Sequence, residues 1–345
     1  MKPSRREFLV ASAVAVGSPS SAKQAKATGI GLLSYSYGIR SRLQKDRPLS
    51  NPLHFFELAK ERGATSVQMN LTAADEAEAK AIRKRAEELE LNVEGIVSLP
   101  KDATGQIRFK RELGIARACG AIVVRTVVLG GRRYETFGRL EEFRDFDRKA
   151  REMLKQAESI ARTHDIILAL ENHKDYRAEE LADVMKAISS VFLGVCLDTG
   201  NNIALLENPL ETVKTLAKWT RTVHLKDMGV EESPTGFLLS EVPLGEGRLD
   251  LVKIVATVRE ANPKARFNLE MITRDPLSIP CLTEKYWATM PSVPGFDLAR
   301  MLTWVRAEKR MESLPRISKL SEKDQLARED EHVKRSMAFA KRSGW

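Results

Sequence analysis

The sequence is poor in the residues that staple small domains or build zinc modules. It has 3 Cys and 5 His among 345 residues, and no two cysteines form a C-x-x-C pair. A disulfide scaffold and a cysteine-rich zinc module are therefore excluded. The sequence also lacks the repeated apolar runs of about 20 residues that a multi-span membrane protein needs. The rest of the composition, 43% apolar and 30% charged, is typical of a folded globular protein.

A net charge of +9 would ordinarily suggest a nucleic-acid partner, but the excess lies at the two ends of the chain. Residues 1–27 carry five basic residues against one acidic, and residues 306–345 carry eleven against seven. The stretch between them has 40 basic and 39 acidic residues and is nearly neutral. We therefore predict no nucleic-acid partner.

The N-terminus combines a charged start, a short apolar run to Val16 and small residues up to Ala27. This order is typical of a secretory signal, and eight or so apolar residues are too few to span a membrane. The paired Arg5 and Arg6 before Phe8 make the segment resemble a twin-arginine signal; the alternative is a basic N-terminus without an export role. We predict a signal over residues 1–27, export to the periplasm or cell envelope, and no membrane anchor after cleavage.

Residues 28–305 alternate short apolar runs with amphipathic stretches that suit helices. Such strand–helix alternation predicts an α/β protein with parallel strands, and eight units in this length match a (β/α)₈ TIM barrel. An open doubly wound sheet is the competing architecture, but no G-x-G-x-x-G follows the first run. The eight predicted strands are residues 30–35, 65–71, 92–99, 121–129, 165–170, 191–197, 220–225 and 266–271.

Residues 306–345 form a C-terminal extension in which a helix is predicted to run from Ser321 to Ala340. Its apolar residues are sparse, so we expect the helix to lie against the barrel or against a neighbouring subunit. The domain prediction is thus a signal over 1–27, a barrel over 28–305 and a helical extension over 306–345. A homo-oligomer is left open.

Four consecutive predicted strands end on a potential metal ligand: Glu171, Asp198, His224 and Glu270. A carboxylate just past a strand is often only the N-cap of the next helix. Closure of a barrel, however, brings these strand ends together, and three carboxylates in one apolar mouth would repel each other. A divalent cation removes that cost, and this ligand set suits Mn²⁺, Mg²⁺, Co²⁺ or Zn²⁺.

The motifs A-L-E-N-H, C-L-D-T-G-N, V-H-L-K-D, G-E-G-R-L-D and N-L-E-M resemble those of the xylose isomerase-like TIM barrel proteins, the sugar phosphate isomerase/epimerase group. The resemblance implies that Glu171, Asp198, His224 and Glu270 hold one divalent metal ion, most readily Mn²⁺. It also implies that Glu171 and Glu270 act as an acid/base pair. The predicted function is a sugar isomerase or epimerase that moves a proton beside a carbonyl through a metal-stabilised enediolate, with a small sugar or keto-sugar as substrate.

The sequence departs from the ketose epimerases of that family near the predicted ligands. Asn201 stands where they have a His, Gln68 replaces an acidic residue, and Lys226 comes where an Arg is expected. We predict that His173, Asn201 and Lys226 contact the substrate. Lys226 has a second interpretation as an ion-pair partner of Asp227, and His173 has one as a support for the metal ligands.

Three long insertions follow predicted strands at the same end of the barrel: residues 130–146, 228–247 and 272–295. Loops of this length in a compact domain are usually functional. Arg132 in the first and Trp287 in the third are predicted to bind substrate, although an oligomer contact or a surface lid is an equal alternative.

Three other functions are alternatives to the isomerase or epimerase. A metal-dependent lyase could use the same chemistry on 3-keto-glycosides or keto-inositols and expel a β-substituent. A non-catalytic sugar-binding barrel is a further alternative. A multi-zinc endonuclease of related fold is disfavoured because it needs many histidines at strand ends, whereas only His224 and His173 are so placed.

Overall fold

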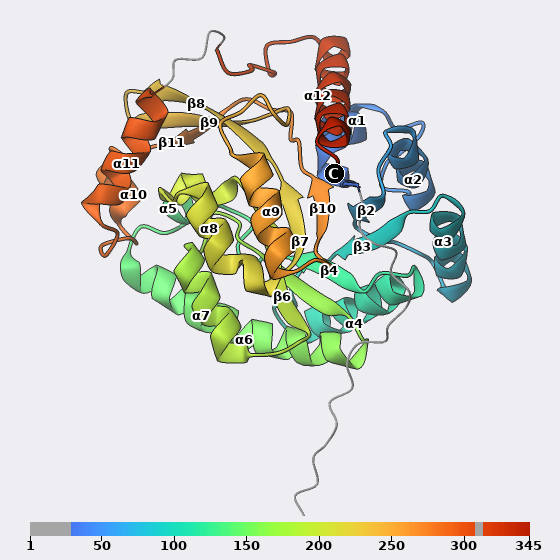
Figure 1. The fold of residues 1–345 in the computed structure, drawn as a ribbon. Coiled ribbons are helices and arrows are strands. Elements are labelled where there is room, and N and C mark those ends of the chain that lie inside the picture. The colour runs from blue at the N-terminus through green and yellow to red at the C-terminus, as the bar shows by residue number, and fades with distance from the viewer. Residues whose placement is uncertain (1–28, 308–312) are drawn as a thin grey trace, which may run out of the picture.

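The computed structural model describes residues 29–307 and 313–345, and its centre is a closed barrel of eight parallel strands (Figure 1). Neighbours around the barrel follow the order β1-β10-β7-β6-β5-β4-β3-β2. Each strand coincides with one of the eight predicted runs, so the predicted (β/α)₈ fold is confirmed. The strands are β1 (Gly31–Leu33), β2 (Ser66–Met69), β3 (Asn92–Ile96), β4 (Val123–Thr126), β5 (Ile167–Glu171), β6 (Leu193–Asp198), β7 (Thr220–Leu225) and β10 (Arg266–Leu269).

Helices surround the strands and connect each one to the next (Figure 1). Side chains that accept hydrogen bonds from the first turn fix several of the starts, among them Asp75, Asp102 and Asp250. The helices are α1 (Gly38–Leu43), α2 (Pro52–Glu61), α3 (Glu76–Glu88), α4 (Ala103–Ala118), α5 (Arg133–Thr136), α6 (Leu140–Thr163), α7 (Ala178–Ile188), α8 (Pro209–Leu216), α9 (Leu251–Ala261), α10 (Glu284–Trp287), α11 (Gly295–Arg306) and α12 (Glu322–Arg342), with 3-10 turns η1 (Ser34–Tyr37), η2 (Asn201–Leu205) and η3 (Ala217–Trp219).

The main hydrophobic core lies between the strands and this layer of helices. Alternate strand residues such as Val67, Leu168 and Val223 point outward and pack with helix residues such as Phe55 and Leu181. The other strand residues point into the barrel, and most of those are polar. The barrel interior therefore combines a polar layer with a small apolar cluster of Val123, Ala169 and Cys196, in place of the stack of branched apolar side chains that usually fills such barrels.

Gly31 provides space for that polar layer. A Cβ atom at this position would lie 2.0 Å from Ser66 Oγ and 2.2 Å from Asn268 Oδ1. Ser66 Oγ donates a hydrogen bond to Asn268 Oδ1 over 3.0 Å. A larger residue on β1 would displace this pair, so the glycine is required by close approach.

All three predicted insertions are corrected by the structure, because none is an irregular loop. The first contains α5 and the start of α6. β8 (Asp227–Ser233) and β9 (Gly236–Val242) form an antiparallel hairpin, and β11 (Leu277–Ile279) adds to its edge. Together with α10 and α11 this small sheet encloses a second hydrophobic cluster that includes Phe237, Leu239, Ile279 and Tyr286. The turn Ser233-Pro234-Thr235-Gly236 was the available sequence signal for the hairpin.

The G-E-G-R-L-D motif, residues 245–250, wraps around the carboxylate of Asp227. This carboxylate accepts backbone hydrogen bonds from Met228, Gly245, Gly247 and Leu249 over 2.8–3.1 Å. A Cβ at Gly247 would lie 2.1 Å from Asp227 Oδ1, so the chain can approach this closely only with glycine there. The carboxylate thus fixes the return from the hairpin to α9.

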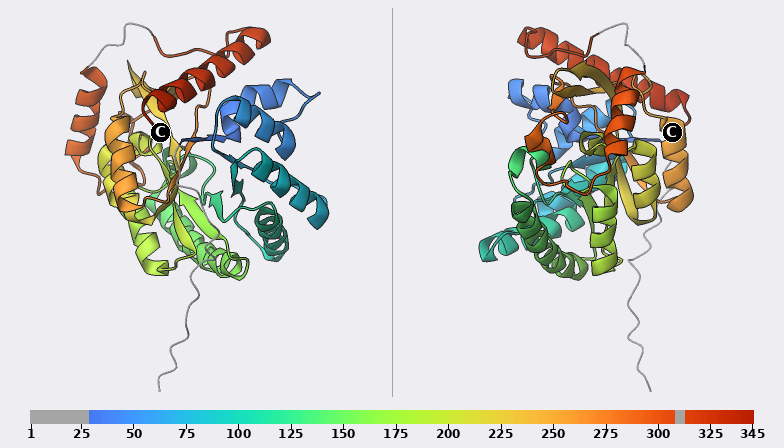
Figure 2. Two further views of the ribbon diagram at one scale, coloured as in Figure 1. Left: turned by 45° about the vertical axis from the view of Figure 1, so that its right-hand side comes forward. Right: turned by 90° about the vertical axis from the view of Figure 1, so that its left-hand side faces the viewer.

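The predicted C-terminal helix is present as α12 and packs against α1 and η1 of its own chain (Figure 2). Glu329 is buried and accepts the backbone N–H groups of Ile39 and Arg40, which lie in the first turn of α1. Asp330 pairs with Arg62 over 2.6 Å. The interpretation of this helix as a part that lies against the barrel is therefore confirmed, whereas contact with a neighbouring subunit stays a prediction.

The predicted signal lies within residues 1–28, outside the described residues. In the described part of the chain, no helix is both long and apolar enough to cross a membrane.

Replacing Asp227 by Ala is expected to destabilise the protein. The change leaves four backbone donors without their acceptor in a buried turn, so the free energy of unfolding should fall by roughly 2–4 kcal/mol. Urea unfolding followed by circular dichroism measures the effect, with Asp46→Ala at an exposed position as the control. Equal stability of the two variants would contradict the structural role given to Asp227.

Candidate metal centre and active site

The four predicted metal ligands meet at the mouth of the barrel. Glu171 ends β5, Asp198 ends β6, His224 lies in β7 and Glu270 directly follows β10. One ligand atom from each lies within 4.8 Å of the ligand atoms of the other three, and all four residues are buried. The parallel register causes this meeting, because Asp198 is aligned with His224 on the neighbouring strand.

The free electron pairs of these residues fit a divalent cation. Asp198 Oδ2, His224 Nδ1 and Glu270 Oε2 are buried, and the nearest cation to the two carboxylate oxygens is the Lys226 ammonium, at 2.9 and 3.0 Å. His224 Nδ1 lies 3.1 Å from Glu270 Oε2 and 3.4 Å from Glu171 Oε2. Carboxylates that converge at one buried point are costly, and a divalent cation that joins them offsets this cost. Carboxylate and imidazole donors suit Mg²⁺, Mn²⁺, Co²⁺ or Zn²⁺.

Gln68 and Glu94 determine which nitrogen of His224 faces the other ligands. A carboxylate can only accept, so the Gln68 amide turns its N–H toward Glu94 Oε2 at 2.9 Å and its oxygen toward His224 Nε2 at 2.6 Å. Nε2 must then carry the proton that it donates to this oxygen. Nδ1 therefore faces the carboxylates and is the nitrogen available to a metal ion. Burial opposes the charged form of His224, but the negative groups around it, Glu270 and Glu171 among them, raise its pKa well above the usual range, so a metal ion would displace a proton from Nδ1.

Glu171 is held by donors on both oxygens. The buried Arg125 guanidinium of β4 pairs with Oε2, and Asn201 Nδ2 donates to Oε1 over 3.0 Å. Burial alone would raise the pKa of Glu171, but the charges of Arg125 and His224 outweigh burial and hold this pKa well below its usual range. Asn201, predicted to bind substrate, therefore contacts a predicted metal ligand directly.

Lys226 points into the same centre and does not pair with Asp227. Its Nζ lies 2.9 Å from Asp198 Oδ2 and 3.0 Å from Glu270 Oε2. Burial opposes the charged form, but the surrounding carboxylates, Asp198 first among them, raise the pKa of Lys226 above its usual range. Burial raises the pKa of Asp198 itself to about 6. The ammonium thus offsets part of the negative charge collected at the mouth.

A cavity of about 290 Å³ opens beside the four ligands, near the lower end of the ~300–1,000 Å³ typical of small-molecule sites. Three residues predicted to bind substrate, Arg132, His173 and Lys226, lie on its wall together with Glu270. His173 Nδ1 lies 3.1 Å from the carbonyl of Leu129. Burial lowers the pKa of His173 to about 4, so the ring is neutral at pH 7.

Trp287 lies away from this cavity. Its indole N–H donates to the Cys281 carbonyl over 2.9 Å, and its ring packs on Tyr286 with 5.4 Å between ring centres. The residue therefore contributes to the second hydrophobic cluster. Its predicted contact with substrate finds no support in this placement.

The sequence did not identify Arg125, Glu94 or Lys174 as parts of the site. Arg125 and Glu94 had a signal, since each is a charged residue inside an otherwise apolar strand. Lys174 directly follows the A-L-E-N-H motif, lines the cavity and donates to Asn201 Oδ1. Burial lowers the pKa of Lys174 to about 8, which leaves it a cation at neutral pH.

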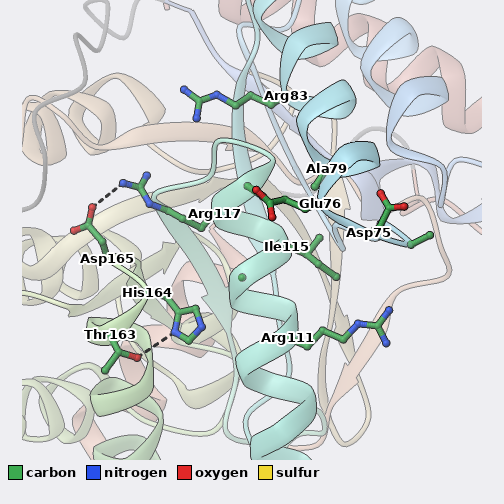
Figure 3. Close-up of a pocket in the computed structure, with 13 residues that line it drawn as sticks. Asp75, Glu76, Ala79, Arg83, Arg111, Ile115, Arg117, Thr163, His164 and Asp165 are labelled. Atoms are coloured by element: carbon green, nitrogen blue, oxygen red, sulfur yellow. Dashed lines mark hydrogen bonds and ion pairs between the residues drawn. The ribbon is translucent and has the colours of Figure 1, made fainter.

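A larger hollow of about 950 Å³ lies elsewhere, along α4 between α3 and the end of α6 (Figure 3). Charged side chains including Arg83, Arg111 and Glu76 border it, and Arg117 pairs with Asp165 over 2.7 Å. Neither the four ligands nor any residue predicted to bind substrate lines it. The chemistry that the sequence predicts therefore belongs to the smaller cavity at the barrel mouth.

Residues 56–290 match the model of the xylose isomerase-like TIM barrel family, and the chain belongs to that family. The resemblance inferred from the motifs is thus confirmed.

Known relatives include enzymes that act on small sugars. The 3-oxo-isoapionate decarboxylase of Pectobacterium atrosepticum is 30% identical over 237 residues, which are 67% of this chain and 80% of the relative. The structure of an L-ribulose 3-epimerase aligns with a TM-score of 0.59 at 15% identity, covering 92% of this chain and 94% of its own. A xylose isomerase-like protein of Mycobacterium smegmatis in complex with magnesium gives 0.55 at 17% identity, covering 80% and 98%. At these identities the two structures establish the fold alone.

We expect the double variant Asp198→Ala, His224→Ala to lose stoichiometric metal. Removing two of four ligands leaves a site too weak to survive dialysis, whereas the wild type should retain one divalent ion per chain. Elemental analysis after dialysis against Mn²⁺ and then metal-free buffer measures the difference. The control Asp183→Ala, His164→Ala makes the same changes outside the site, and full retention of metal by the first variant would refute the ligand assignment.

Gln68→Leu is expected to weaken metal binding about 10–100-fold, the usual effect of removing a partner that orients a ligand. Leucine cannot accept the Nε2 proton of His224, so neither the tautomer nor the ring orientation stays fixed. Titration of the metal-free protein with Mn²⁺ by calorimetry measures the affinity. Gln156→Leu on the exposed face of α6 is the control; equal affinities of the two variants would rule out the positioning role.

Proposed function

We propose that the protein is a divalent-metal-dependent enzyme that converts a small keto-sugar by moving a proton at the carbon beside its carbonyl group. The observation that carries this proposal is the convergence of Glu171, Asp198, His224 and Glu270 beside a cavity of monosaccharide size. The names of the relatives, an epimerase and a decarboxylase, support a reaction of this kind.

The four ligands would hold the ion, which when bound supplies Lewis-acid polarisation of a substrate carbonyl. Mn²⁺ is the ion we expect first. Asp198 and His224 have no other task in this proposal, since neither lines the cavity. The burial of all four ligands keeps water from competing for the charge that develops on the substrate oxygen.

Glu270 is the residue that we assign to proton transfer. It lines the cavity, and its Oε2 is 3.0 Å from the Lys226 ammonium. A carboxylate at this wall can take the proton from the α-carbon, so the C–H electron pair enters the enediolate. Lys226 also faces the cavity and can donate a hydrogen bond to the oxygen on which negative charge grows.

An isomerase or epimerase with two acid/base groups would use Glu171 as the second one. Its two oxygens, however, already accept from Arg125 and Asn201, and it does not line the cavity. This observation favours a second candidate, a lyase in which only one proton moves. Loss of CO₂ or of a β-substituent breaks a bond to carbon, and Glu270 then serves as the single acid or base. A non-catalytic sugar-binding barrel would use the Glu270 carboxylate only to accept hydrogen bonds from sugar hydroxyl groups, with no proton transfer to carbon.

Export by a twin-arginine signal stays a proposal that rests on Arg5, Arg6 and the apolar run after them. It implies that substrate is met in the periplasm or cell envelope. A homo-oligomer likewise stays a proposal.

The proposal predicts deuterium exchange at the α-carbon of a substrate. Mn²⁺-loaded protein is incubated in D₂O with a panel of ketoses, 3-keto-glycosides and keto-acids, and the products are followed by NMR and mass spectrometry. Exchange should fall by about 10²–10⁴-fold in Glu270→Gln, which cannot accept a proton. Glu284→Gln at an exposed position is the control, and metal content is measured in each variant.

The same incubation separates the two candidates. Exchange with a retained carbon skeleton supports the isomerase or epimerase. Release of CO₂ or of a β-substituent, with one deuterium gained from solvent where CO₂ is lost, supports the lyase. Neither exchange nor release from any member of the panel would count against both.

A further inference from the structure

The cavity beside the metal ligands has a strongly basic wall. Four cationic side chains line it, from Arg132, Lys174, Lys226 and Arg274, each in a different segment of the barrel mouth. The lining contains only two carboxylates, Glu135 and Glu270, and Glu270 belongs to the ligand set. A neutral sugar would not need such an excess of positive charge.

Three of these cations already have carboxylate partners within the protein. Arg132 pairs with Glu135 over 2.5 Å, and Arg274 pairs with the buried Glu241 over 2.7 Å. Lys226 pairs with Asp198 and Glu270, as described above. A guanidinium has five N–H donors. These ion pairs use only part of them, so both arginines retain donors for a ligand.

Lys174 differs from the other three cations. Only 5% of its surface is exposed, and among the described residues no carboxylate lies within ion-pair distance of it. The partner of its Nζ is the neutral amide oxygen of Asn201. A buried ammonium without an ion-pair partner is costly. Because Lys174 lies at the cavity wall, an anionic group of a ligand in the cavity can serve as that partner.

The backbone holds Lys174 in place at a further cost. Its φ is +65°, a left-handed conformation that is unfavourable for a non-glycine residue. The carbonyl of Lys174 accepts from the Arg133 N–H over 3.0 Å. The buried Arg133 in turn donates to the Thr289 carbonyl over 2.7 Å, so segments that follow β4, β5 and β10 are tied together around the cavity.

We propose that Lys174, assisted by Arg132 and Arg274, binds a carboxylate group of the substrate, which is therefore a sugar acid or keto-acid rather than a neutral sugar. The assignment rests on the proposed function for the placement of the reacting carbonyl at the metal ligands. One unpaired cation matches the single charge of a carboxylate, whereas a phosphate monoester brings about two charges at neutral pH.

The test compares two polyols that differ in one end group and cannot react, because neither has a ketone. D-Gluconate carries a carboxylate where D-glucitol carries a hydroxymethyl group, and glucitol 6-phosphate provides the phosphate alternative. Binding to Mg²⁺-loaded protein is measured by calorimetry at fixed ionic strength. Gluconate should bind at least about tenfold more tightly than glucitol, as a charge-assisted hydrogen bond predicts.

Lys174→Met removes the charge and keeps the length of the side chain, and it should reduce the preference for gluconate to within about threefold. Lys174→Arg should keep the preference, and Lys253→Met on the exposed face of α9 is the matched control. Metal stoichiometry and the unfolding temperature are measured for each variant. If Lys174→Met fails to fold, Arg132→Leu, which should also weaken the preference, takes its place.

Several outcomes would overturn the inference. Equal binding of gluconate and glucitol by the wild type would exclude a carboxylate subsite without any variant. A preference for gluconate that survives in Lys174→Met would show that Lys174 does not bind the carboxylate and that the metal ion or the two arginines do. Tighter binding of glucitol 6-phosphate than of gluconate would replace the carboxylate by a phosphate. Because no probe can turn over, these results do not depend on the deuterium-exchange experiment that tests the proposed function.

Discussion

The burial of three carboxylates and one histidine at a single point is the constraint on which the rest of the barrel interior depends. In a low-dielectric interior the mutual repulsion and lost hydration of Glu171, Asp198 and Glu270 would oppose folding. Arg125 and Lys226 offset part of this cost from neighbouring strands. A divalent ion bound by Asp198 Oδ2, His224 Nδ1 and Glu270 Oε2 would offset more of it. Charge balance therefore explains why a barrel core that could be apolar is polar here.

The same balance explains the layer beneath the ligands. Glu94 accepts from Gln68, Thr222 and Asn268, so three strands besides its own contribute to one hydrogen-bonded network. Buried polar networks are favourable only when each member finds its partner, which restricts the side chains to one arrangement. His224 stands on top of this network through Gln68. Its orientation is consequently a property of the whole barrel interior and not of β7 alone.

The strand ends and the four ligands could be predicted because parallel strands of a closed barrel must bring their carboxyl ends together. The contacts among other residues could not. The contact between Arg125 and Glu171 requires that both side chains point into the barrel and that β4 and β5 pair in the observed register. Neither condition can be predicted from the single charged residue in the apolar sequence of β4. The placement of Trp287 could not be predicted for a related reason. Its insertion folds with the hairpin into a second hydrophobic cluster, so the ring packs against that cluster and does not line the cavity.

The residues where this chain departs from the ketose epimerases, Gln68, Asn201 and Lys226, all touch a metal ligand without being one. In the proposed function the four ligands would support the formation of an enediolate, and the residues around them would decide which product forms from it. Asn201 and Arg125 donate hydrogen bonds to the two oxygens of Glu171. Glu270, which pairs with Lys226, lines the cavity instead. Lys174 adds a charge that the four ligands do not need. Under the proposed function, the four ligands alone do not distinguish an epimerase from a decarboxylase, and the difference must be sought in the cavity wall.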